Sequence, residues 1–114
     1  MTEHEIFKSS ARSSGDLSGV FEFDGETGYF YLYDQTHKSD QMIIDQIRIL
    51  NGKPDFGEDE VLIRWDNAER TVGLLIRGEV WAVFDAEFRA KHGGDYLPDG
   101  VSTVPAALAQ RFTG

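Results

Sequence analysis

The chain of 114 residues contains no cysteine, which excludes disulfide bonds, thiolate metal sites and a cysteine nucleophile. It has no apolar run near the roughly 20 residues that a membrane helix needs. Residues 1–14 lack the apolar core of a signal peptide, so we expect a cytoplasmic location and no membrane contact. Basic residues are scarce, because 11 lysines and arginines face 20 acids and leave a formal charge of −9. Since binding to phosphates requires a basic surface, we expect no nucleic-acid partner.

The most regular pattern lies over residues 19–33, where two aromatic-rich segments flank a loop containing Asp24, Gly25, Glu26 and Gly28. Aromatic residues favour strands and the small and acidic loop favours a reversal, so we predict a β-hairpin that pairs about 19–23 with 28–34. Alternating apolar residues predict four further strands, over 42–50, 61–66, 71–76 and 79–85. A tight turn at Arg77-Gly78 is expected to join the last two.

The two ends of the chain carry weaker patterns. Residues 1–15 are rich in serine and predict a flexible tail, followed by a single β-rich domain over 16–114. Residues 86–92 fit either a continued strand or a helix, and their alanines favour one or two helical turns after a strand that ends near 85. Val104, Leu108 and Phe112 recur at helical spacing and predict a short C-terminal helix that covers one end of the sheet.

Six strands joined mainly by short turns predict a mainly β fold with one antiparallel six-stranded sheet. With so few helical residues to cover it, this sheet must curl into a small sandwich or a partly open barrel to bury one face. An exposed edge strand allows two copies to pair, so a monomer and an edge-paired homodimer both fit the pattern.

Groups that could bind metals or catalyse a reaction are few. Residues 55–60 contain four carboxylates, but they do not match the twelve-residue calcium loop, so a solvated acidic loop is the simpler interpretation. The three histidines are widely separated: His4, His37 and His92. The serines form no Gly-x-Ser-x-Gly motif. We therefore expect no metal, no cofactor and no catalytic residue.

Asp45 is the most suggestive single acid. It shares a predicted strand face with three isoleucines: Ile43, Ile47 and Ile49. A carboxylate on an apolar face is either held protonated by its surroundings or paired with a base. The arginines that could pair with it are Arg48, Arg64 and Arg77. Structural pairing, or exposure at the strand edge, explains Asp45 more simply than catalysis does. A hydrolase that uses Asp45 or Glu22 is kept as an alternative.

Three tyrosines, Tyr29, Tyr31 and Tyr33, share one face of the second hairpin strand. Tyrosines provide rigid amphipathic contact area that is typical of recognition surfaces. The alternative is that this face packs inside a closed barrel or beneath the C-terminal helix. We take the three tyrosines, together with Asp24 and Glu26 of the hairpin loop, as the candidate binding residues.

Residues 21–31 read Phe-Glu-x-Asp-Gly-Glu-Thr-Gly-Tyr-Phe-Tyr and, with the strands up to residue 85, resemble a family of small bacterial proteins of unknown function. The likeness covers about residues 19–85. It implies a bacterial source and a compact soluble domain, and it brings no activity or cofactor with it.

The function expected from the residues is that of a small acidic, non-enzymatic binding or regulatory domain that recognises a protein. A basic partner would suit the charge of −9 through electrostatic steering. Two alternatives are kept: a small-molecule-binding β-barrel or weakly signalled hydrolase, and a calcium-binding module.

Overall fold

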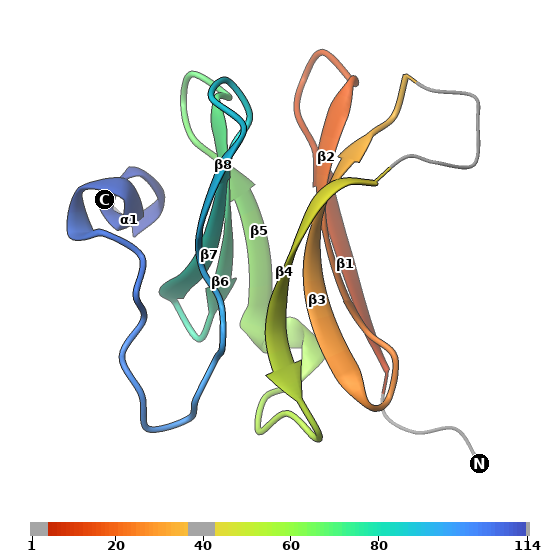
Figure 1. Cartoon of the computed structure of the whole chain (residues 1–114), viewed down its shortest axis with the longest axis vertical. Coiled ribbons are helices and arrows are strands. Elements are labelled where there is room, and N and C mark those ends of the chain that lie inside the picture. The colour runs from red at the N-terminus through yellow and green to blue at the C-terminus, as the bar shows by residue number, and fades with distance from the viewer. Residues whose placement is uncertain (1–4, 37–42, 114) are drawn as a thin grey trace.

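The computed structural model describes residues 5–36 and 43–113, and its strands form two four-stranded antiparallel sheets that pack face to face (Figure 1). The first sheet contains β1 (Ile6–Ala11), β2 (Leu17–Phe23), β3 (Thr27–Asp34) and β4 (Ile43–Asn51). The second contains β5 (Val61–Trp65), β6 (Thr71–Ile76), β7 (Glu79–Asp85) and β8 (Ala90–Gly93). A 3-10 turn, η1 (Glu58–Glu60), precedes β5, and the helix α1 (Ala106–Thr113) follows the second sheet. In each sheet, strands that are consecutive in the chain are neighbours.

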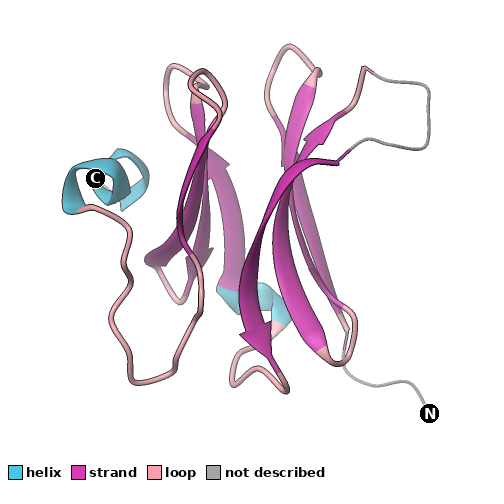
Figure 2. Ribbon diagram, viewed as in Figure 1, coloured by secondary structure: helices cyan, strands magenta, loops and turns pink. Residues whose placement is uncertain are grey.

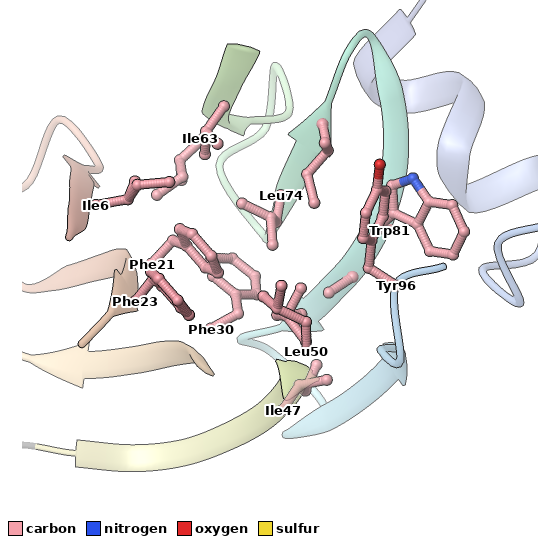
Figure 3. Close-up of a cluster of buried hydrophobic side chains, with 14 of the residues drawn as sticks. Ile6, Phe21, Phe23, Phe30, Ile47, Leu50, Ile63, Leu74, Trp81 and Tyr96 are labelled. Atoms are coloured by element: carbon pink, nitrogen blue, oxygen red, sulfur yellow. The ribbon is translucent and has the colours of Figure 1, made fainter. Parts of the chain in front are cut away.

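The core lies between the two sheets and follows from the alternation of side chains along each strand. In β3, Phe30 and Leu32 are fully buried and face the second sheet, whereas the tyrosines between them face outward. Phe30 lies opposite Phe21 of β2 in the hairpin register, and its ring centroid is 5.1 Å from that of Phe84 in β7. Figure 3 shows how aromatic and aliphatic side chains from both sheets meet in this layer.

The two central strands of the second sheet, β6 and β7, are buried on both faces. Every residue of β6 is buried, because α1 packs against the face that looks away from the core (Figure 2). Phe112 of α1 lies directly over Gly73, where an added Cβ atom would come within 3.1 Å of the phenylalanine ring. The C-terminal helix is therefore present as expected, but it covers an outer face of the second sheet, not one end of a single sheet.

The prediction of a mainly β antiparallel fold is confirmed, and the prediction of one six-stranded sheet is wrong. The chain changes sheets after β4, through a connection that contains Pro54, Gly57 and η1. Backbone amides of Asp95 and Tyr96 donate to carbonyl groups of β4, and the Trp65 indole donates to the Ser10 carbonyl on β1. These bonds fasten the edges of the two sheets, and the described strands do not close into a barrel.

Two strands were missed in the sequence. The segment expected to be a flexible tail contains β1, which pairs with β2 over its whole length and buries Ile6. The helical turns expected within 86–92 are also absent. Amides of Glu87 and Phe88 donate to the Asp85 carboxylate at 3.0 Å, and Arg89 has a φ of 56°, so the chain reverses there and enters β8.

Candidate functional site

Tyr29, Tyr31 and Tyr33 form a continuous line along β3, which we call the tyrosine ridge. It lies on the face of the first sheet that looks away from the core, and each of its side chains is half-buried. The ring centroids of Tyr29 and Tyr31 are 5.8 Å apart in a stacked arrangement, and those of Tyr31 and Tyr33 are 5.9 Å apart, edge to face. Such contacts hold the rings in place, so the ridge is a preformed surface.

The residues beside the ridge on β2 are small and buried. Ser18 lies opposite Tyr33 and Val20 opposite Tyr31, and these two residues are only 2% and 4% exposed although they belong to the outward face. Larger neighbouring side chains therefore cover these two residues. The alternatives in which the tyrosines pack inside a barrel or beneath the helix are wrong, because α1 lies on the other sheet (Figure 2).

The field on the β2 side of the ridge is negative, whereas exposed Arg48 of β4 lies opposite Tyr29 on the other side. The pKa of Tyr31 is raised, first by burial and then by the charge of Glu22, its tyrosine neighbours and Asp24. Glu22 is exposed on β2 and lies opposite both Tyr29 and Phe7 in the register of the sheet. A cation would therefore be favoured at this end of the ridge.

The two acids of the hairpin loop have different roles. Asp24 accepts hydrogen bonds from the amides of Glu26 and Thr27, both at 2.9 Å, and these bonds lower its pKa. It therefore fixes the turn between β2 and β3. The Glu26 side chain is exposed, while its carbonyl accepts the amide of Gly52 from the next loop at 2.6 Å. Both acids lie at the Tyr29 end of the ridge, because Phe23 and Gly28 close the hairpin there.

A hollow of about 270 Å³ lies at this same end of the sheet and was not foreseen from the sequence. The residues that give it its character are Glu5, Phe7, Glu22, Asp24 and Glu58, and none of the described residues that line it is basic. Phe7 is 58% exposed and stands beside the carboxylates. The adjacent apolar residues Ile6 and Phe7 were the available signal, but the serines that follow them weaken the strand pattern.

Asp45 forms an ion pair, as structural pairing predicts, but its partner is a lysine and none of the three arginines that the sequence suggested. Its carboxylate is 3.1 Å from the ammonium of Lys91 on β8, a strand that the sequence did not reveal. Asp45 lies opposite Leu32 on the core side of the sheet, at its rim, whereas Glu22 belongs to the outer face. The two residues named for the hydrolase alternative therefore lie on opposite faces of the sheet, and the structure does not bring them together.

Two of the four carboxylates of segment 55–60 form ion pairs within the protein. The Arg77 guanidinium contacts Asp55 at 3.1 Å and Glu60 at 2.9 Å, and the Tyr96 hydroxyl donates to Asp55 at 2.8 Å. The pKa of Asp55 is lowered, first by Tyr96 and then by Arg77, and that of Glu60 is lowered first by Arg77. These two carboxylates fasten the loop before β5 to the β6–β7 turn and to the segment after β8.

No group of three or more histidines, cysteines or acids in the described part of the chain is arranged to hold a metal ion. His92 lies in β8, and His4 and His37 fall outside the described residues. Within the same described ranges, no helix has the length and apolar character needed to cross a bilayer.

Comparison with known proteins gives a family but no activity. A family model described as "Uncharacterized protein conserved in bacteria (DUF2251)" matches residues 1–99, which include all eight described strands and end before α1. An uncharacterized protein of Haemophilus influenzae is 36% identical over 93 residues, covering 73% of this chain and 57% of the relative. The chain thus spans little more than half of that relative's length. No solved structure gives a significant match. The chain belongs to this bacterial family of uncharacterized proteins, DUF2251.

Proposed function

We propose that this chain is a small, non-enzymatic binding domain that recognises a protein partner through the tyrosine ridge. The observation that carries the proposal is the difference between the two outer faces of the molecule. The outer face of the second sheet is covered by α1, whereas that of the first sheet carries three ordered tyrosines and no described helix. An aromatic face on which no described helix packs is a typical contact surface.

Exposed apolar residues extend this face on both sides of the ridge. Phe7 of β1 shares the row of Glu22 and Tyr29, and Ile43 of β4 lies opposite Tyr33 and is 44% exposed. Aromatic side chains at the centre of an interface often provide most of its binding energy. The ridge loses little conformational entropy on binding, because its rings are already packed against one another.

The charge around the face favours a basic partner. Glu22, Asp24 and Glu26 lie at the Tyr29 end of the ridge, and the adjoining hollow adds Glu5 and Glu58. Together with the net charge of −9, these acids would attract a basic surface and speed its association. A cytoplasmic location of the domain is part of this proposal.

The proposal is tested with two ridge variants and one matched control. Tyr31→Ala removes the central ring and Glu22→Lys reverses the charge beside it, whereas Phe88→Ala removes an exposed ring from the distant β7–β8 turn. Wild type and variants are used to capture partners from a bacterial lysate. Captured proteins are then produced separately and titrated at low and high salt.

We expect Tyr31→Ala to weaken binding of the partner by roughly 30-fold, the effect of a central aromatic contact. Glu22→Lys should slow association, and the difference from wild type should shrink as salt is added. Phe88→Ala should bind like wild type. A partner that binds Tyr31→Ala as tightly as wild type would contradict the proposal.

A further inference from the structure

A separate groove of about 340 Å³ lies where the end of β4 meets the segment that follows β8. We call it the β4 groove. It is lined by residues 48–51, 53–55 and 95–98, and it contains none of the three ridge tyrosines. Its size is at the small end of the range found for ligand sites, which is roughly 300–1,000 Å³.

The wall formed by Tyr96 is rigid. Its amide donates to the Ile49 carbonyl at 2.6 Å and its hydroxyl donates to Asp55 at 2.8 Å. Its ring packs edge-on against Trp81, with centroids 4.8 Å apart (Figure 3). It also packs edge-on against Phe56, with centroids 5.1 Å apart. A side chain held from several directions gives a preformed surface, so a ligand would not have to order it.

The apolar part of the groove is incompletely covered. Leu50 and Tyr96 are buried and form its inner surface, while Pro54, Leu97 and Pro98 line its outer part. Leu97 is 61% exposed, although the other large apolar side chains of the groove are buried. A ligand with an apolar body would remove this leucine from water.

Two cations line the groove without a strong partner. Arg48 is 3.8 Å from Asp95, whose side chain is 81% exposed, and such a surface pair adds little. Lys53 is exposed and forms no ion pair with any described residue. Asp55 is also in the groove, but Arg77 and Tyr96 already bind its carboxylate. In a chain with nine more acids than bases, these two weakly engaged cations are available to an anionic ligand.

We infer that the β4 groove binds a small organic acid whose carboxylate is held by Arg48 and Lys53 and whose apolar or aromatic body covers Tyr96 and Leu97. The Asn51 side chain adds a hydrogen-bond donor, because its carbonyl oxygen already accepts from the Thr27 hydroxyl at 3.3 Å and its amino group remains. Arg48 lies opposite Tyr29 in the register of the sheet, but the lining of the groove contains none of the ridge tyrosines, so either assignment can fail without the other.

The test is a two-dimensional amide NMR titration of the full chain with 4-phenylbutyrate and, as the uncharged control, 4-phenylbutyramide. We expect saturable shifts at the amides of Asn51, Lys53, Tyr96 and Leu97 with the acid, and at least fivefold weaker binding of the amide. Equal affinity for the two probes, or no saturable shift at these amides, would overturn the inference.

Variants locate the site and separate it from the ridge. Lys53→Gln and Arg48→Gln should each weaken binding of 4-phenylbutyrate by about threefold to tenfold, the effect of losing one charged contact. Arg89→Gln removes an exposed cation from the β7–β8 turn and should leave the affinity unchanged. Tyr31→Ala should also leave it unchanged. Binding that survives both groove substitutions would refute the assignment.

Discussion

Phe30 and Tyr31 are adjacent in β3, and their aromatic side chains point to opposite faces of the first sheet. Phe30 is fully buried between the sheets, with its ring 5.1 Å from Phe84. Tyr31 is half-buried in the outer face, between Tyr29 and Tyr33. Replacing each residue by alanine in turn tests directly which face of the strand belongs to the core.

The expected loss of stability is larger for Phe30→Ala than for Tyr31→Ala. Removing a buried phenylalanine ring costs about 3–5 kcal/mol, because the cavity between two sheets closes poorly. Tyr31→Ala loses two aromatic contacts of about 0.5–1.5 kcal/mol each, partly regained through the freedom of the shorter side chain, so we expect about 1–2 kcal/mol. At roughly 4 °C per kcal/mol, Tm should fall by about 12–20 °C for Phe30→Ala and by about 4–8 °C for Tyr31→Ala.

Urea unfolding followed by the fluorescence of Trp65 and Trp81 measures both losses under the same conditions. The two transitions should have similar slopes, so that the midpoints report stability alone. If Tyr31→Ala were as destabilising as Phe30→Ala, the outward face would be part of the core and the binding proposal would lose its basis. The reverse ranking would refute the register of β3 itself.

Three further predictions concern packing and ionisation. Gly19→Ala should cost about 1–3 kcal/mol in urea unfolding, because its Cβ atom would lie 2.8 Å from a methyl group of the second sheet. Arg77→Gln should lower Tm at pH 7. Its carboxylate partners Asp55 and Glu60 have lowered pKa values in the folded protein. Their contribution to the stability of the fold is therefore present above pH ~4 and is lost as the pH falls through the folded pKa. The Tm difference between wild type and Arg77→Gln should disappear in acid for this reason. Tyr96 should ionise near pH 12 in an ultraviolet titration, since burial and Asp55 raise its pKa to about 12, and Asp55→Asn should lower that value.

The parts of the fold that depend on near neighbours were predictable. The hairpin of β2 and β3 has the expected pairing, with Phe21 opposite Phe30. The turn between β6 and β7 also lies where Arg77-Gly78 places it, and both residues have positive φ, 55° and 82°. In each case the strand pattern and the turn chemistry lie within one short segment, so local physics decides the outcome.

The strands that were missed depend on distant partners. β1 has an ambiguous sequence with only Ile6 buried, and it becomes a strand because β2 offers it a free edge. β8 pairs with β7 after a turn that Asp85 fixes, and its Lys91 then supplies the base for Asp45. Neither the strand nor the ion pair can be read from residues 86–92 alone.

The candidate site shows the same division. The sequence placed Tyr29, Tyr31 and Tyr33 on one face and the acids of the hairpin loop at one end of it. It did not place Phe7, Glu5 or Glu58 beside them, because those residues come from β1 and from the connection to the second sheet.

By itself, the sequence determined that the chain forms antiparallel strands and which side chains share a face of β3, since a period of two is a local property of the backbone. In β4 it did not, because a register shift places Ile43 on the outer face, opposite to Asp45. It could not decide which face of β3 is inside, because both faces carry large aromatic residues. That choice was made when the two sheets packed together over Phe30 and when α1 covered the second sheet instead of the first. The tyrosines face outward because their hydroxyl groups need water or a hydrogen-bond partner, which the apolar surface of another sheet does not offer. Phenylalanine and leucine have no such requirement, so they occupy the face between the sheets.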